Sequence, residues 1–179
     1  MTTTEFLERL TPVSDSADYR KALGHVPTSV AIVTGAGRSG PVGMTVGSFT
    51  SVSLDPPLIT FFVGRGSSTW LKLYAGDHFG VNIVGHDQGE LCRAFSRPVE
   101  DRFAGVAWRR SALGAPLLEA AIVNLECTRV RVDVIGDHYQ VVGRVESLRL
   151  QATDPPLIFL RGGFVDLDHL SEGDGRTAP

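Results

Sequence analysis

Cysteine is scarce in this sequence, and its placement builds no recognisable site. The 179 residues contain two cysteines, Cys92 and Cys127, which form neither a C-x-x-C pair nor a Cys/His spacing typical of metal ligands. The pattern therefore indicates neither a disulfide framework nor a zinc site, and we expect no bound metal. Both cysteines are expected to be small buried hydrophobic residues.

Long hydrophobic runs and an excess of one charge are also lacking. No segment approaches the ~18 consecutive apolar residues of a membrane helix, and the chain does not start with a basic stretch followed by an apolar one. The formal net charge is -3 at pH 7, with the arginines scattered along the chain. We therefore expect a cytoplasmic protein whose partners include neither a membrane nor nucleic acid.

The remaining composition is that of a globular protein. Hydrophobic residues make up 42% of the chain and charged residues 21%, so a real core can form. A length of 179 residues fits one domain better than two. We expect an N-terminal extension over 1–14, a folded domain over 15–168 and a flexible tail over 169–179, because the last residues are polar and contain glycine.

The hydrophobic pattern predicts more strands than helices. Three short helices are expected: one capped by Asp15 or Ser16, one that follows 67–69 and one over 88–95. Extended segments are expected over 30–34, 42–53, 58–63, 79–84, 123–134, 141–150 and 157–160. The two longest form a hairpin that turns at 135–138. Because strands and helices do not alternate regularly, the order favours a mainly β fold, an antiparallel barrel with a few short helices.

One glycine-rich motif imitates a dinucleotide fingerprint. Gly35, Gly37 and Gly40 match G-x-G-x-x-G, and Asp55 lies near the distance expected for a ribose-binding acid. That fingerprint works only if a helix begins at the glycines, because the helix N-terminus holds the pyrophosphate. Residues 41–48 include two glycines, two valines and a threonine, each costing up to ~1 kcal/mol of helix propensity. A hairpin turn is expected there instead of a Rossmann site.

The segment after these glycines carries a family resemblance. Residues 43–57, GMTVGSFTSVSLDPP, resemble the signature of the flavin reductase-like family of FMN-binding split barrels. Further motifs of that family follow in the expected order at 27–34, 67–69, 79–83, 136–138 and 161–164. The resemblance extends from Tyr19 to Asp166. It implies a six-stranded antiparallel Greek-key split β-barrel with a few short helices.

The same resemblance implies an activity and its partners. Similar proteins are NAD(P)H:flavin oxidoreductases that transfer hydride from NADH to FAD or FMN and supply the reduced flavin to a separate flavin-dependent monooxygenase. We therefore expect FAD, with FMN as the alternative, and NADH as the donor, since no 2′-phosphate site can be read in the sequence. Relatives cover apolar barrel surface by dimerising, so a homodimer is expected.

The signature segment also makes physical sense as a flavin site. An isoalloxazine ring needs hydrogen-bond donors along one edge, and an extended chain of small residues lets main-chain N–H groups approach it. These donors would stabilise the negative charge that grows on the reduced ring. The alternative is that Ser and Thr merely suit an outward strand face. The expected contacts are Met44, Thr45, Val46, Gly47, Ser48, Phe49, Ser51, Val52 and Ser53.

A phosphate position is expected beside this segment. Ser67, Ser68 and Thr69 precede an apolar helical run and can cap it, which makes the helix start a candidate flavin-phosphate site or a cap alone. The resemblance implies that Arg102 lies near the phosphate. It also implies flavin contacts at Val63, Phe95 and Phe103.

Two late residues are assigned by the resemblance. His138 follows Gly136 and Asp137 at the end of the predicted hairpin, and the matching histidine of similar proteins lies near the nicotinamide. We expect His138 to be the catalytic residue, in the sense of orienting NADH. Phe164 is expected to close over the flavin or the nicotinamide.

Two other classes of function stay open. The same barrel can hold FMN tightly as an electron carrier without NADH turnover. It can also support an oxidase of the pyridoxamine phosphate type, although the sequence has no cluster of basic residues suited to a second phosphorylated substrate. Retention of flavin through dialysis would favour the carrier.

Overall fold

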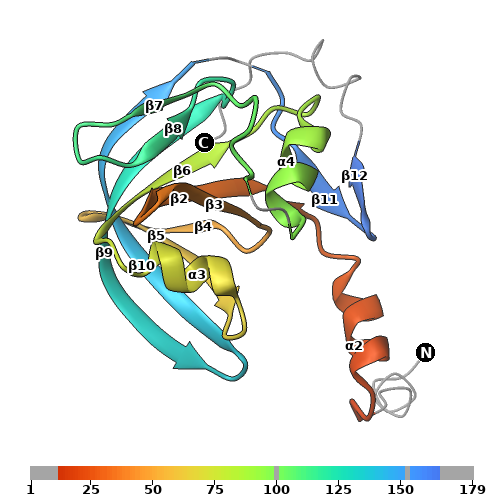
Figure 1. Cartoon of the computed structure of the whole chain (residues 1–179). Coiled ribbons are helices and arrows are strands. Elements are labelled where there is room, and N and C mark those ends of the chain that lie inside the picture. The colour runs from red at the N-terminus through yellow and green to blue at the C-terminus, as the bar shows by residue number, and fades with distance from the viewer. Residues whose placement is uncertain (1–11, 99–100, 152–153, 166–179) are drawn as a thin grey trace.

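The computed structural model describes residues 12–98, 101–151 and 154–165 and shows a barrel of antiparallel strands flanked by short helices (Figure 1). The expected tail over 169–179 and most of the expected extension over 1–14 lie outside the described residues. Among the described residues, no helix is long and apolar enough to cross a membrane. In the same ranges, no group of three or more His, Cys, Asp or Glu residues is placed to hold a metal ion.

Seven antiparallel strands form the main sheet, in the order β3-β2-β6-β9-β10-β5-β4. The predicted mainly β antiparallel fold is confirmed, and the signature segment supplies two of its strands, β3 and β4, which brings the sheet to seven strands where six were expected. Their bounds are Ala31–Gly37 (β2), Gly40–Val46 (β3), Thr50–Leu54 (β4), Pro57–Gly64 (β5), His78–Ile83 (β6), Val123–Ile135 (β9) and His138–Leu150 (β10).

The rejected dinucleotide fingerprint is a hairpin turn, as predicted. Gly37 pairs with Gly40 at the end of the β2–β3 ladder, and Gly40 has a φ of 136°, which favours glycine. The chain continues from Gly40 as strand β3 and not as a helix. No helix N-terminus therefore faces these glycines, and the Rossmann reading is wrong for this chain.

Ser48 ties the chain between the two edge strands to β5. It lies between β3 and β4, and its Oγ accepts a hydrogen bond from the Phe62 N–H of β5 at 2.9 Å and donates one to the Phe62 carbonyl at 3.2 Å. These bonds replace the sheet ladder at the point where the chain leaves β3. They bring the β3 end of the sheet against β5 and so close the barrel.

Two smaller sheets complete the strands. One consists of β1 (Thr28–Ser29), β11 (Ile158–Leu160) and β12 (Gly163–Val165), and the other of β7 (Trp108–Arg110) and β8 (Pro116–Leu118). The sequence analysis missed β1, β7, β8 and β12, because strands of two or three residues are too short to show a period.

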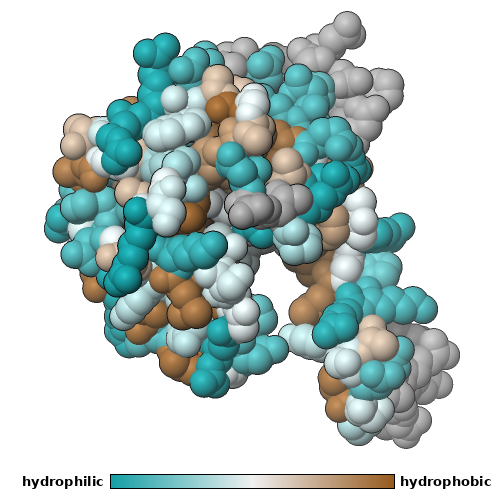
Figure 2. All heavy atoms as spheres, in the orientation of Figure 1, coloured by the Kyte–Doolittle hydropathy of each residue, from teal (hydrophilic) through white to brown (hydrophobic). Residues whose placement is uncertain are grey.

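All three predicted helices are present, and two of them begin at the predicted caps. In α2 (Ser16–Leu23), the Asp15 carboxylate accepts from Ala17 N–H at 2.8 Å; in α3 (Ser68–Leu73), the Ser67 hydroxyl accepts from Trp70 N–H at 3.2 Å. Helix α4 spans Gly89–Ser96 and packs with α3 against β3. Helix α2 buries no residue, and Figure 2 shows an open gap between it and the barrel body.

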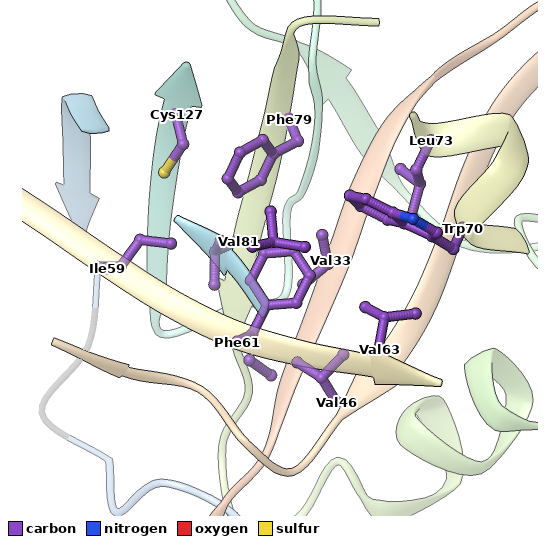
Figure 3. Packing of buried hydrophobic residues seen from close by; sticks show 12 residues of the cluster. Val33, Val46, Ile59, Phe61, Val63, Trp70, Leu73, Phe79, Val81 and Cys127 are labelled. Atoms are coloured by element: carbon purple, nitrogen blue, oxygen red, sulfur yellow. The ribbon is translucent and has the colours of Figure 1, made fainter. Parts of the chain in front are cut away.

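A hydrophobic core fills the barrel and α3 covers one end of it (Figure 3). Phe61 is fully buried, and its ring meets Phe79 at 5.7 Å and Trp70 of α3 at 6.4 Å, both edge to face. Truncating such a ring to alanine typically costs about 3–5 kcal/mol. A second cluster lies between the sheet and α4 and includes Phe95, Phe103 and Leu118.

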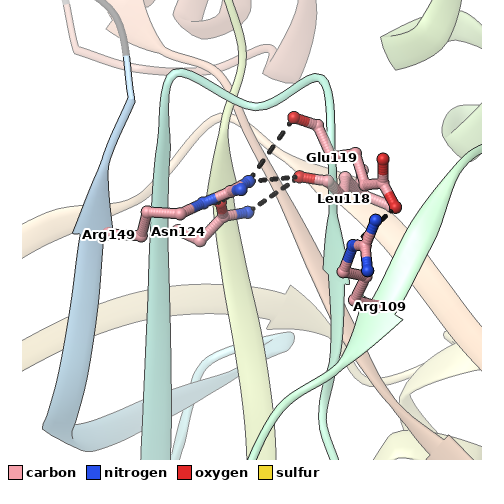
Figure 4. A network of polar contacts seen from close by, with 5 residues as sticks. All are labelled: Arg109, Leu118, Glu119, Asn124 and Arg149. Atoms are coloured by element: carbon pink, nitrogen blue, oxygen red, sulfur yellow. Dashed lines mark hydrogen bonds and ion pairs between the residues drawn. The ribbon is translucent and has the colours of Figure 1, made fainter.

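Buried amide side chains fix the small β7–β8 sheet to the barrel, and Figure 4 shows one of them, Asn124, with its contacts to Leu118 and Arg149. Asn82 Oδ1 accepts from Leu118 N–H and from Asn124 Nδ2, both at 2.8 Å, and Asn124 Nδ2 also donates to the Leu118 carbonyl. Arg149 Nε donates to Asn124 Oδ1 at 2.8 Å. Every member of this network has a partner, so its burial is compensated.

Candidate functional site

The signature segment forms both edges of the main sheet. Strand β3 ends the sheet on one side and β4 on the other, so each has one backbone edge without a neighbouring strand. The side chains of β3 point elsewhere: Val46 is 5% exposed in the barrel core, and Thr45 Oγ1 donates to the Cys92 carbonyl of α4 at 2.8 Å. What this segment can offer a ligand is therefore chiefly main-chain hydrogen-bonding groups.

Gly43 allows the closest approach of α4 to β3. A Cβ atom at this position would lie 2.7 Å from Phe95 Cε1, which is well inside normal contact. Phe95 is fully buried and meets Phe103 edge to face at 5.0 Å. The side chains of these two predicted flavin contacts are thus core residues that support β3 from beneath.

Arg102 joins three parts of the chain at β3. Its Nη1 donates to the Gly43 carbonyl at 2.8 Å and to Thr69 Oγ1 of α3 at 3.0 Å, and its Nε donates to the Arg97 carbonyl at 3.0 Å. Within the described part of the chain these bonds use Nε and Nη1 and leave Nη2 for an anion. Burial lowers the pKa of Arg102, but a guanidinium stays charged at neutral pH.

The Ser67 loop continues from this cluster along the barrel rim. Ser67 Oγ lies 3.9 Å from Met44 Sδ of β3, and Ser67 N–H donates to the Gly64 carbonyl at 3.0 Å. Ser68 is exposed as the first residue of α3. The predicted phosphate residues Ser67, Thr69 and Arg102 are therefore brought together beside Met44.

His138 lies at the other end of the same loop. It is the first residue of β10 and pairs with Gly64, and its half-exposed ring has Nδ1 2.6 Å from Asp137 Oδ1. The hydrogen bond from His138 lowers the pKa of Asp137, so the ionised carboxylate orients the imidazole. A shallow groove runs here, lined by Gly64, Arg65, Gly66, Asp137, His138 and Tyr139.

The other predicted contacts are more scattered. Val63 is 2% exposed and belongs to the core, whereas Ser51 and Val52 are exposed on edge strand β4, and Ser53 and Phe49 are partly buried. Gly47 is exposed at the end of β3. These positions border the site without forming a cluster with His138.

Phe164 lies on α4. Its ring meets Phe159 at 5.9 Å, and the Arg93 guanidinium is 5.1 Å from its centre. A Cβ atom at Gly89 would lie 3.0 Å from the same ring. Its described contacts are thus with α4 and β11, and its role as a cover over the flavin stays a prediction.

Two features of the site were missed in the sequence. The Gly43 carbonyl is the partner that fixes Arg102, and main-chain groups carry no sequence signal of their own. Gly64 and Gly66 line the groove at His138 and were not predicted as site residues. Two glycines just before Ser67 are a signal that could have been used, because glycine lets the backbone of a loop come close to a ligand. Asp137 was read as part of a motif and proves to be the orienting partner of His138.

The fold and the site together define a class of protein. It is a split β-barrel with Arg102 at one end of the rim and His138 at the other. Comparison with known families makes this specific, since the flavin reductase like domain matches residues 23–168. The chain belongs to the flavin reductase-like family, and the predicted family and split-barrel fold are confirmed.

The relatives include reductases and reductase subunits of monooxygenases. The chain is 40% identical over 147 residues to a flavin reductase of Pseudomonas putida, covering 82% of this chain and 86% of the relative. It is 35% identical to the flavin-dependent monooxygenase reductase subunit HsaB of Mycobacterium tuberculosis, covering 86% and 83%.

Solved structures show the same likeness. Nitrilotriacetate monooxygenase component B from Mycobacterium thermoresistibile superposes with a TM-score of 0.84 at 32% identity, covering 92% of this chain and 93% of that one. The NADH:FAD oxidoreductase SgcE6 of Streptomyces globisporus gives 0.82 at 34% identity, covering 89% and 96%, and it has also been solved with NAD and FAD fragments.

Proposed function

We propose that this protein is an NADH-dependent flavin reductase that transfers hydride from NADH to FAD, or to FMN as the alternative. The observation that carries the proposal is the rim that links Arg102 and Thr69 to His138 beside the unpaired edge of β3. The printed activities of the relatives, NADH:FAD oxidoreductase and FMN reductase (NADH) among them, support it.

The residues present fit a flavin. The Nη2 of Arg102 and the hydroxyl of Thr69 suit a phosphate, and the β3 edge suits the polar edge of a ring. A bound flavin supplies the hydride acceptor, and no nucleophile or metal is required of the protein. Val63, Phe95 and Phe103 support this surface from the core, while Ser51, Val52 and Ser53 border it on β4.

The protein's own residues position the reactants. Main-chain N–H groups of 45–53 stabilise negative charge at the ring edge, because fixed dipoles need no reorganisation during the reaction. His138, whose Nδ1 is held by Asp137, lines the groove and orients the nicotinamide half of NADH. The site is open, which suits a flavin that binds, is reduced and leaves.

The reduced flavin is proposed to pass to a separate flavin-dependent monooxygenase in the cytoplasm. Relatives named as reductase subunits of such systems support this partner. A homodimer is proposed because Tyr19 and Leu23 of α2, and Val26 after it, are about half exposed, and a second copy would cover them. Light scattering should then give twice the 19.2 kDa chain mass, and a monomer would contradict this. The domain is proposed to span 15–168.

The proposal is tested by following NADH oxidation by the purified protein with FAD, with FMN and without flavin. Rapid oxidation that requires flavin is expected. If neither flavin supports oxidation of NADH or NADPH while FMN stays bound through dialysis, the protein is a flavin carrier and the reductase proposal is wrong.

A further inference from the structure

A cleft continues from Arg102 away from the barrel rim. A small recess beside Arg102 and Thr69 shares Pro41, Val42, Lys72, Asp101 and Phe103 with a larger cleft of about 860 Å³. The larger cleft reaches the β2–β3 turn on one side and β7 on the other. Its size lies within the range of small-molecule sites in proteins.

The charges of this cleft suit an anion. Arg38 of the β2–β3 turn and Lys72 of α3 line it, and Arg102 lies at its start. Neither Arg38 nor Lys72 has an ion-pair partner among the described residues. One carboxylate lines it, that of Asp101, which accepts the Phe103 N–H at 2.8 Å, so the two cationic side chains outnumber it.

The cleft also offers an aromatic surface. Trp108 of β7 lines it and is partly exposed, and its ring is braced edge to face on buried Phe103 at 5.9 Å. A tryptophan held in this way keeps one face ready for a planar group. Cationic side chains followed by an aromatic face match a phosphate joined to a purine nucleoside.

We propose that this cleft is a subsite for the AMP half of FAD. The inference rests on the proposed flavin site, because the second phosphate and the adenosine of FAD are joined to the phosphate placed at Arg102 and Thr69. Lys72 and Arg38 then bind the second phosphate, and Trp108 stacks on the adenine. FMN lacks this half, so the cleft makes the protein selective for FAD.

The test compares FAD and FMN binding by titration calorimetry on the full chain. In the double variant R38A/K72A, both changes lie on the surface, and the Kd for FAD is expected to rise about tenfold while the Kd for FMN stays within about twofold. Trp108→Leu keeps apolar bulk on Phe103 but removes the stacking face, and it should weaken FAD alone. Arg131→Ala, an exposed arginine on β9, is the matched control and should leave both unchanged.

Two results would overturn the subsite. If R38A/K72A weakened the binding of FAD and FMN equally, Arg38 and Lys72 would merely attract anions in general. An unchanged Kd for FAD would show that the cleft does not bind it. AMP separates this inference from the proposed function: it should bind the wild type and lose affinity in R38A/K72A even if neither flavin binds. Absence of AMP binding together with tight FMN binding would reject the subsite and leave the flavin site standing.

Discussion

The Arg102 guanidinium lies 3.0 Å from the Thr69 hydroxyl, and the same Nη1 atom donates to the Gly43 carbonyl at 2.8 Å. One side chain thus connects β3, α3 and the segment after α4, all of which border the proposed flavin site. The arginine is therefore a brace for this part of the chain and, in the proposed flavin site, the main cation. These two roles can be separated by mutation.

Replacing Arg102 should weaken both flavins, since each contains the phosphate placed there. Loss of a charge-assisted hydrogen bond of about 1.5–3 kcal/mol predicts that Arg102→Ala raises the KM for FAD and FMN by at least about tenfold. Arg102→Lys keeps the charge but not the fork and should recover part of the loss. Thermal unfolding of each variant controls for lost bracing; unchanged KM values in a folded Arg102→Ala protein would contradict this role.

Replacing His138 should affect NADH and not flavin. Because the ring lies at the groove and is held by Asp137, His138→Ala should lower kcat/KM for NADH about tenfold through lost positioning, with the flavin Kd unchanged. His25→Ala, at the exposed end of α2, is a matched control. Steady-state kinetics with NADH varied decides the point, and equal effects of the two substitutions would remove His138 from the reaction.

Glu126 should make stability depend on pH. Burial raises its pKa, but hydrogen bonds from Ser111, Leu113 N–H and Ser147 outweigh burial and lower it overall. A lowered pKa means that this stabilisation is present above the usual glutamate range and is lost as pH falls through the folded-state value. Glu126→Gln should therefore cost about 1–2 kcal/mol of unfolding free energy at pH ~7.

Unfolding measurements at low pH provide the control for the prediction on Glu126. Denaturant titrations below pH ~4 should show a smaller difference between Glu126→Gln and the wild type, because the unfolded carboxyl is then largely protonated. A difference that stays constant across this range would mean that packing, not ionisation, explains the effect.

Neither cysteine should react in the native protein. Burial raises the pKa of Cys92 and of Cys127 to about 12, so almost no thiolate forms at pH ~8. Titration with a disulfide reagent should detect no rapidly reacting thiol in buffer and two per chain in denaturant. Fast labelling of the native protein would show that one of these sites opens.

Elements with a strong local pattern could be read from the sequence. The β9–β10 hairpin combines long β-branched strands with a glycine turn, and Asp15 and Ser67 cap helices at the predicted places. The fingerprint at 35–40 was resolved by helix propensity alone. In each case the decisive sequence signal lies within one short, continuous segment of the chain.

Elements fixed by distant contacts could not be read in this way. Strand β8 is held at Leu118 by the amide of Asn82, which is far away in sequence, together with the nearer Asn124, and β7 pairs with β8. The division of the signature segment depends on Ser48 bonding to Phe62. That the side chains of Val63 and Phe95 lie in the core could not be read either, because apolar residues suit both a core and a ring-binding surface.

The most direct test of the account is anaerobic reduction of excess FAD by NADH with a small amount of protein. If flavin is a substrate that leaves the site, many equivalents of FAD per chain should be bleached, at a rate proportional to protein concentration. Reduction that stops at one equivalent per chain, or that does not occur, would contradict the claim that this barrel reduces flavin and releases it.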